Sequence, residues 1–218
     1  MKCKLLNILL LLNIFVFQTF AQDSLSGNHI ISCTEIRYDY KFGVINDTAG
    51  VLVSEQFYNI SGKVENLILY YINGMVYKII KYKYDQNNNP VEKLDYYSNG
   101  TLSLKTVNYF DDNTRFITAS DEYYPSGDVY KYHKFINDSL GNVIRDDTYF
   151  ANGNKYSSIV HSYKYNAAGK ITEQISYNEL GFLISIYTYK YNSEGYLIEK
   201  KLYNNVKEPV SLFKYFYR

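Results

Sequence analysis

Side chains able to do acid–base or metal chemistry are few in this sequence, and they are scattered. The three histidines are His29, His133 and His161. None has a cysteine or a second histidine at a spacing typical of metal ligation. The nucleophile elbow, the zinc-protease motif and the phosphate-binding loop are absent from the sequence. We therefore expect no catalytic residues, no metal ligands and no cofactor, and an enzyme would need a site assembled from distant residues.

Two acidic pairs, Asp111-Asp112 and Asp146-Asp147, are the next candidates for acid–base work or calcium binding. Neighbouring residues of a strand point to opposite faces, so the two carboxylates of a pair would not act together. Neither pair resembles a calcium loop with oxygen ligands at alternating positions. Solvation of turns is the role that the pattern favours.

Tyrosine is the most distinctive side chain: the sequence holds 27 tyrosines and no tryptophan. Many tyrosines lie two residues apart, which places both rings on one face of a strand. Such a face could be a platform on which sugar rings stack, but the ordinary use of strand aromatics favours cross-strand packing of the rings, at roughly 0.2–1 kcal/mol per pair, and the lack of tryptophan also weighs against a platform. The predicted ligand-binding residues are Tyr163, Tyr165, Tyr187, Tyr189 and Tyr191.

The elements that would position these rings are short strands. Gly or Asn recurs at turn positions along the sequence, and both tolerate the positive φ of tight hairpin turns. The intervals leave room for one turn and one strand each, which predicts an antiparallel meander of about a dozen strands. The turn positions are Gly50, Gly62, Gly74, Asn89, Gly100, Asn113, Gly127, Gly141, Gly153, Gly169, Gly181 and Gly195.

Internal repeats support one continuous fold. Residues 45–50 match residues 136–141, which predicts two related halves. Residues 165–171 and 191–197 each begin with Tyr-Asn and run through a Gly turn into an aliphatic residue. They resemble the YD repeats of bacterial RHS-type proteins, and residues 97–102 resemble the related MORN-like repeats. The resemblance covers roughly residues 37 to 205 and departs from the YD pattern by placing Asn where Asp is expected. It implies an extracytoplasmic β-repeat protein that binds carbohydrate or mediates surface contacts.

The N-terminal segment reads as an export signal. Lys2 and Lys4 precede an apolar run that is too short to span a bilayer, and Ala21 offers a small residue at the cleavage site. We expect residues 1–21 to be a signal peptide, residues 22–36 a flexible lead-in, and residues 37–218 the β-repeat domain. An uncleaved membrane anchor is the alternative. The expected location is extracytoplasmic: periplasmic, on the cell surface or secreted.

Cysteine content and net charge limit the covalent links and binding partners that we expect for this chain. Cys3 leaves with the signal peptide, so Cys33 has no partner for an internal disulfide. A free thiol is the expected state, and a lipid-anchored cysteine is the alternative. The net charge of +1 does not indicate the strongly basic surface that is typical of nucleic-acid binding. The expected partner is a glycan or a cell-surface protein, with no transmembrane helix in the mature chain.

The fold class that these features predict is all-β: an antiparallel meander of repeated hairpins in an elongated or spiralling sheet. The predicted function is non-catalytic binding of glycan or protein ligands. The alternative is an outer-membrane β-barrel, which the export signal and the aromatic C-terminal strand favour. Four lysines inside predicted strands weigh against that alternative, namely Lys83, Lys131, Lys164 and Lys190.

Overall fold

The computed structural model of the chain describes residues 30–46 and 48–218. The predicted signal peptide, residues 1–21, lies outside the described residues, as do most of the predicted lead-in and Asp47. The described part consists of β-strands joined by turns, which confirms the all-β prediction. No helix in this part is long and apolar enough to cross a membrane.

Fifteen strands follow one another, and β1 begins at Ser32, within the segment predicted as a lead-in. Their enrichment in β-branched and aromatic residues suits a pleated sheet. The strands are β1 (Ser32–Lys41), β2 (Val44–Ile45), β3 (Val51–Tyr58), β4 (Val64–Tyr70), β5 (Val76–Tyr84), β6 (Pro90–Tyr97), β7 (Leu102–Phe110), β8 (Ile117–Tyr123), β9 (Val129–Asn137), β10 (Val143–Phe150), β11 (Lys155–Tyr165), β12 (Ile171–Asn178), β13 (Leu183–Tyr191), β14 (Leu197–Tyr203) and β15 (Pro209–Tyr217).

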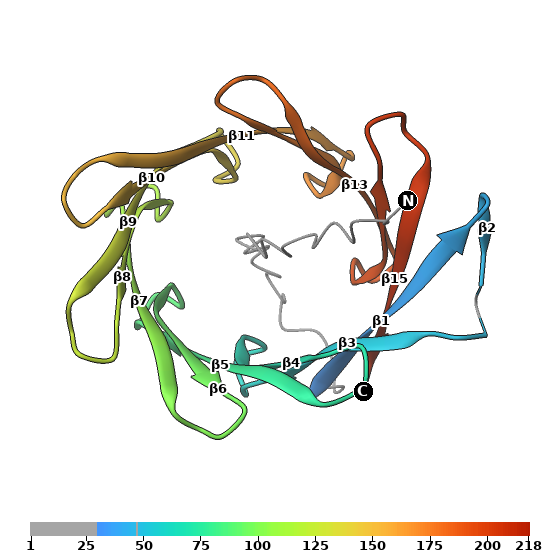
Figure 1. Cartoon of the computed structure of the whole chain (residues 1–218), viewed down its shortest axis with the longest axis horizontal. Helices are drawn as coiled ribbons and strands as arrows, with labels where there is room; N and C mark the ends of the chain where they lie inside the picture. Colours follow the sequence, from blue (N-terminus) through green and yellow to red (C-terminus); the bar gives the residue numbers. More distant parts are fainter. Residues whose placement is uncertain (1–29, 47) are drawn as a thin grey trace, which may run out of the picture.

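The strands form an antiparallel meander whose two ends meet. Every strand from β3 to β14 pairs with the next one, and β1 pairs with β3. β15 also pairs with β1, in register from Cys33–Tyr217 to Asp39–Ser211. The sheet therefore closes as a ring of every strand except β2, a barrel of fourteen strands, and β2 lies outside the ring against β1 (Figure 1).

Closure corrects the prediction of an open, elongated or spiralling sheet. The meander was predicted rightly, but the first and last strands satisfy each other's edge hydrogen bonds instead of standing open. Each pairing from β3–β4 to β14–β15 contains a register shift, such as the one at Lys83/Tyr84. Bulges of this kind bend and twist the strands, and their curvature accumulates around the ring.

The turns lie at the two ends of the barrel, which we name by their residues. The Asx rim holds the turns at residues 59–63, 85–89, 111–116, 138–142, 166–170 and 192–196. The tyrosine rim holds the turns at residues 71–75, 97–101, 124–128, 150–154, 178–182 and 204–208. Viewed along the barrel, the turns of the tyrosine rim spread outward, and those of the Asx rim lie toward the inside of the ring (Figure 1).

The turns share one hydrogen-bond pattern. In the turn at 166–170, the Asn166 N–H donates to the Lys170 carbonyl over 2.9 Å, and the Gly169 N–H donates back to the Asn166 carbonyl over 3.0 Å. The φ of Gly169 is 73°, in the left-handed region that favours glycine. Three turns place another residue at this position, with positive φ at Asn88, Arg115 and Lys207. The predicted turn positions Asn89 and Asn113 are therefore each displaced along the chain.

At the Asx rim, each turn begins with Asn or Asp, whose side chain caps the turn. In the turn at 138–142, Asp138 Oδ1 accepts hydrogen bonds from the backbone N–H groups of Leu140 and Asn142, both over 2.9 Å. In the Asx-rim turn at 111–116, the backbone N–H and the hydroxyl of Thr114 donate hydrogen bonds to the Asp111 carboxylate. These bonds hold the pKa of that carboxyl below its usual range. These hydrogen bonds satisfy backbone N–H groups that cannot bond a neighbouring strand where the chain reverses direction.

The repeating unit is one hairpin. The strands that follow the Asx-rim turns begin at residues 64, 90, 117, 143, 171 and 197, each with an aliphatic residue or proline. The predicted match of residues 45–50 with 136–141 is wrong as a structural repeat. The first of these segments joins β2 to β3, whereas the second ends β9 and enters a hairpin turn.

The barrel has an inner and an outer wall because side chains alternate along every strand. On one wall, Glu35 of β1 reaches Lys200 of β14 across the intervening β15, and Glu35 is 7% exposed. On the other wall, the side chains of Lys83, Lys164 and Lys190 are 65%, 72% and 65% exposed. Side chains converge on the concave side of a closed sheet, so the first wall is the inner one.

Candidate functional site

The inner wall carries polar and ionisable side chains around the ring, and we name this set the inner belt. Its members come from almost every strand of the barrel because each strand turns alternate residues inward. The inner belt consists of Glu35, Ser54, Lys78, Lys93, Asp95, Glu122, His133, Asp146, Thr148, His161, Gln174, Ser176, Tyr189, Lys200 and Tyr215.

At the seam of the barrel, the inner belt centres on the Glu35 carboxylate. Lys200 Nζ donates to Glu35 Oε1 over 2.8 Å, and the Tyr215 hydroxyl donates to the same oxygen over 2.8 Å. The Ser54 hydroxyl donates to Glu35 Oε2 over 2.9 Å. The four residues come from β1, β14, β15 and β3, so a single buried charge ties together the strands on both sides of the closure.

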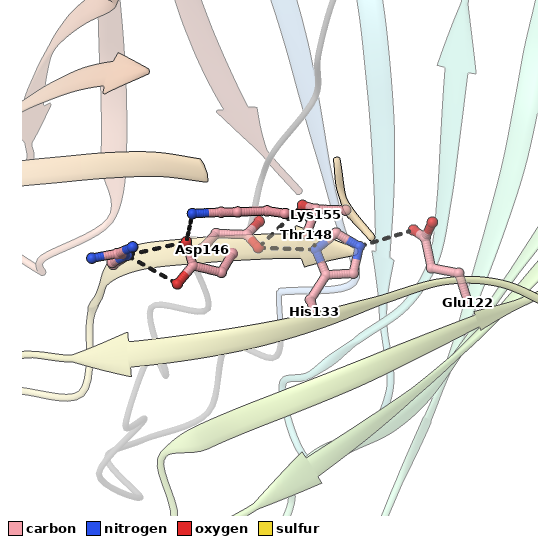
Figure 2. Close-up of polar contacts among 7 residues, drawn as sticks. Glu122, His133, Asp146, Thr148 and Lys155 are labelled. Atoms are coloured by element: carbon pink, nitrogen blue, oxygen red, sulfur yellow. Dashed lines mark hydrogen bonds and ion pairs between the residues drawn. The ribbon is translucent and has the colours of Figure 1, made fainter. Parts of the chain in front are cut away.

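A second group lies on β8, β9 and β10. His133 Nδ1 is 2.9 Å from Asp146 Oδ1, and its Nε2 is 3.9 Å from Glu122 Oε1 (Figure 2). Thr148 Oγ1 is 3.2 Å from the same Nδ1. With a carboxylate facing each ring nitrogen, the imidazole is held as a cation that pairs both acids. This arrangement fixes side chains on the wall and leaves no free basic nitrogen for proton abstraction.

The acidic pair Asp146-Asp147 is split between the two walls. Asp146 faces His133 on the inner wall, while Asp147 receives Arg145 and Lys155 on the outer wall, with Lys155 Nζ 3.1 Å from Asp147 Oδ1 (Figure 2). The prediction that neighbouring acids of a strand do not act together is confirmed for this pair. The other pair, Asp111-Asp112, lies in a turn of the Asx rim, as expected for turn solvation.

Opposite charges balance along the inner belt. Lys78 Nζ lies 2.9 Å from Asp95 Oδ2, and Lys93 Nζ lies 3.6 Å from Asp95 Oδ1. Together with the two groups above, the ion pairs of the belt join four acids to four basic side chains, which gives an inner wall that is polar without a strong net charge. The acids are Glu35, Asp95, Glu122 and Asp146, and the bases are Lys78, Lys93, His133 and Lys200.

The predicted ligand-binding tyrosines face the inner wall, and their hydroxyls already bond the protein. Tyr163 donates to the Val143 carbonyl and Tyr191 to the Ile171 carbonyl, each over 2.8 Å. Tyr189 donates to Gln174 Oε1 over 2.8 Å, and Tyr165 donates to the Asp138 carboxylate. Tyr187 lies beside Lys200, whose Nζ is 5.8 Å from the ring centre. The five rings therefore share one wall, as their spacing predicted, and that wall is the inside of the barrel.

Sequence reasoning missed the inner belt itself. His133 and His161 were each judged in isolation, and their partners Asp146 and Ser176 come from neighbouring strands. A usable signal was present in the hairpin repeat. Asp95, Glu122 and Thr148 occupy the same position after the starts of β6, β8 and β10, and each of them faces inward. Among the described residues, no group of acidic, histidine or cysteine side chains could hold a metal ion.

Comparison with known proteins gives similarity of shape without sequence relatives. No protein-family model matches this chain, and no curated protein matches it. A porin-like protein from Bacteroides uniformis ATCC 8492 aligns at 9% identity and a TM-score of 0.48, over 87% of this chain and 96% of that one. A porin-like protein from Bacteroides vulgatus ATCC 8482 aligns at 13% identity and a TM-score of 0.47, over 88% of this chain and 99% of that one.

Part of a much larger protein is also similar. The Photorhabdus luminescens Tc holotoxin pore aligns at 13% identity and a TM-score of 0.31, over 78% of this chain and 9% of that one. At TM-scores below 0.5, the function of this chain has to be argued from its own residues.

Proposed function

We propose that this chain is a non-catalytic outer-membrane β-barrel protein whose polar inner wall faces a hydrated lumen. The observation that carries the proposal is the pairing of β15 with β1, which closes the sheet. In lipid, every backbone N–H and C=O must be satisfied within the protein, and closed barrels are the way in which strands achieve this. An antiparallel barrel with an even number of strands and a polar interior is typical of this class.

The inner belt supports a hydrated lumen. Buried polar groups in proteins almost always have a hydrogen-bond partner. On the inner wall of β7 and β8, Thr106 Oγ1, Asn108 Oδ1 and Ser120 Oγ have no protein partner among the described residues. Water or a small polar solute inside the barrel would satisfy them, and the balanced charges of the belt would tolerate solutes of either sign.

A second candidate is a water-exposed extracytoplasmic barrel that binds a glycan or a cell-surface protein. The outer wall favours it, because Glu92 bridges Lys83 at 2.5 Å and Lys105 at 2.7 Å, and Glu173 pairs with Lys164 at 2.8 Å. A lysine facing lipid at the middle of a bilayer costs about 2–4 kcal/mol. The lysines that weighed against a barrel are thus outward and paired, apart from Lys131, which lies near Tyr130 and Tyr156.

Membrane fractionation separates the two candidates. The full chain, expressed with its own N-terminal segment, is fractionated, washed with carbonate, and floated with phosphatidylethanolamine–phosphatidylglycerol vesicles. The outer-membrane barrel predicts protein that resists the carbonate wash and floats with the vesicles. Protein that stays in the aqueous fraction, stable and β-rich without detergent, would overturn that proposal and favour the water-exposed barrel.

A further inference from the structure

Six tyrosines encircle the barrel at one level of the outer wall, next to the tyrosine rim. Each occupies the same position in its hairpin, so that Val64 is followed by Tyr70 as Pro90 is followed by Tyr96. Their register partners on the outer wall include Leu102 and Leu183, and every ring is half-buried, with one side against the wall. The six are Tyr70, Tyr96, Tyr123, Tyr149, Tyr177 and Tyr203, and we name them the tyrosine girdle.

The turns beyond the tyrosine girdle are apolar and mostly uncharged. The turns at 71–75, 97–101 and 150–154 contain no charged residue. Large apolar side chains of this rim are exposed, among them Ile72 at 75% and Leu180 at 74%. In three turns, an aromatic residue packs on another across the reversal, with ring centres 4.9 Å apart, as in Phe150–Tyr156. This end of the barrel therefore presents many exposed apolar and aromatic side chains, interrupted by the charged residues Asp128, Glu179, Lys207 and Glu208.

The hairpin between β1 and β2 adds a projecting apolar tip at the same end. β1 runs antiparallel to β15 and finishes at Lys41, beyond which Phe42 turns the chain with a φ of 52°. Phe42 is 104% exposed, and Val44 beside it is 70% exposed. β2 stands outside the ring of strands (Figure 1). A bulky residue held at positive φ and fully exposed is unfavourable in water alone.

Lysines accompany the aromatic side chains on the outer wall. Lys81 Nζ lies 5.6 Å from the ring centre of Tyr96, Lys134 Nζ lies 5.6 Å from that of Tyr149, and Lys214 Nζ lies 5.0 Å from that of Tyr38. None of these lysines forms an ion pair with a described residue. Tyrosine with unpaired lysine beside it is the chemistry that suits the phosphate level of a bilayer.

The opposite half of the outer wall is ionic. Toward the Asx rim, Glu92 bridges Lys83 and Lys105, and Lys190 pairs with Glu199 at 3.1 Å. The free energy needed to bury these charged groups in lipid would far exceed the free energy that their exposed ion pairs contribute. Ion pairs also occur beside the tyrosine rim, where Lys155 pairs with Asp147 and Glu179, so the two halves of the outer wall differ mainly in the exposed apolar side chains that gather at the tyrosine rim.

From this asymmetry, we infer that the barrel enters a lipid bilayer from one end. The tyrosine rim and Phe42 lie in the boundary between headgroups and acyl chains, the tyrosine girdle and its lysines lie at the headgroups, and the Asx rim stays in water. Insertion of this kind typically buries about 5–10 Å of an amphipathic surface. The inference keeps the membrane contact of the proposed function, but it replaces a barrel that spans the bilayer with one that inserts only its tyrosine rim.

Tryptophan probes test this orientation, because the native sequence contains no tryptophan. Phe42→Trp reports on the tyrosine rim, and Ile60→Trp, at a 90% exposed turn residue of the Asx rim, is the matched control. Both variants are mixed with phosphatidylethanolamine–phosphatidylglycerol vesicles carrying brominated acyl chains, which quench tryptophan within the bilayer. Circular dichroism confirms that each variant folds. We expect strong quenching of Phe42→Trp and none of Ile60→Trp.

The outcomes separate this inference from the proposed function. If the protein floats and both probes are quenched, the barrel spans the bilayer, so the one-ended orientation is wrong while the proposed function stands. Quenching of Ile60→Trp alone would also overturn the orientation. If the protein does not float, the proposed function fails and the orientation fails with it.

A charge placed at each end gives an independent check. Phe42→Asp should weaken vesicle binding about tenfold or more, the factor that loss of one buried phenylalanine produces. Ile60→Asp, at an equally exposed site, should leave binding unchanged. Equal binding by both variants would contradict the inference.

Discussion

At the scale of single residues, the buried Glu35 carboxylate is the decisive group. It receives Lys200, Tyr215 and Ser54, which come from three other strands around the closure. A buried pair is poor evidence for added stability, but removal of one partner leaves the other charge uncompensated. The seam should therefore be sensitive to Glu35 in a way that exposed ion pairs are not.

Glu35→Ala should lower the free energy of unfolding by about 3–5 kcal/mol, because Lys200 would remain buried without a counter-charge. The matched control is Glu199→Ala on the outer wall, whose partner Lys190 is 65% exposed, and we expect a loss below about 1 kcal/mol. Urea unfolding followed by circular dichroism measures both. Equal losses for the two variants would show that Glu35 does not hold the seam.

At the scale of elements, the hairpin turn is the repeated unit, and the residues at its corners decide its stability. Asp138 begins one turn of the Asx rim and accepts hydrogen bonds from Leu140, Asn142 and Tyr165. Burial raises the pKa of Asp138, but these hydrogen bonds outweigh it and hold the pKa below the usual range. The carboxylate therefore stabilises the fold above the unfolded pKa of about 3.9, and that contribution is lost as pH falls through the folded pKa.

Asp138→Ala should cost about 1 kcal/mol at neutral pH, since it removes the acceptor that caps the turn. The deficit relative to the native protein should shrink in acid, where the native carboxylate becomes protonated. Asp138→Asn keeps the Oδ1 acceptor and is the control, with a smaller loss and little dependence on pH. A deficit of Asp138→Ala that stays constant from neutral to acidic pH would contradict this account.

The turn at 204–208 offers a stabilising change. Lys207 holds a φ of 62°, which glycine adopts without the strain that a side chain brings. Lys207→Gly should raise the free energy of unfolding by about 0.5–1 kcal/mol. The reciprocal variant Gly181→Lys, at a φ of 80° in the neighbouring turn of the same rim, should lower it. Thermal unfolding of both variants checks the signs, and a loss of stability in Lys207→Gly would refute the explanation.

At the scale of the whole molecule, closure is the defining property. The β1–β15 pairing is regular over seven residue pairs and has no register shift, unlike every hairpin pairing from β3 to β15. β1 and β15 lie at opposite ends of the described sequence, and their pairing completes the ring. A closed ring leaves no barrel edge free to pair with another molecule.

A disulfide across the seam tests closure. Ile36 and Lys214 are direct partners on the outer wall, so Ile36→Cys with Lys214→Cys should cross-link under mild oxidation and migrate faster on a non-reducing gel. Ile36→Cys with Lys201→Cys places the second thiol one strand further away, on β14, and should not cross-link. Cys33 is buried on the inner wall and stays out of the reaction. Absence of a cross-link in the first pair would indicate an open sheet.

Local features of the fold could be predicted because they depend on neighbours in the chain. The turn at Gly169 follows from the positive φ that glycine allows, and the shared face of Tyr187, Tyr189 and Tyr191 follows from strand alternation. Lys207 shows the limit, because its turn lacks glycine and gave no signal. The resemblance to YD and MORN-like repeats stays a prediction.

The sequence by itself determined the secondary structure, the meander and the alternation of side chains, since each depends on contacts within one hairpin. The tertiary structure alone decided that the sheet closes and which face of each strand became the inner wall. Curvature builds up from a small bulge in every hairpin, so it cannot be read from any one of them. The same accumulation brought Lys200 to Glu35, placed the predicted tyrosines inside the barrel and aligned the tyrosine girdle outside it.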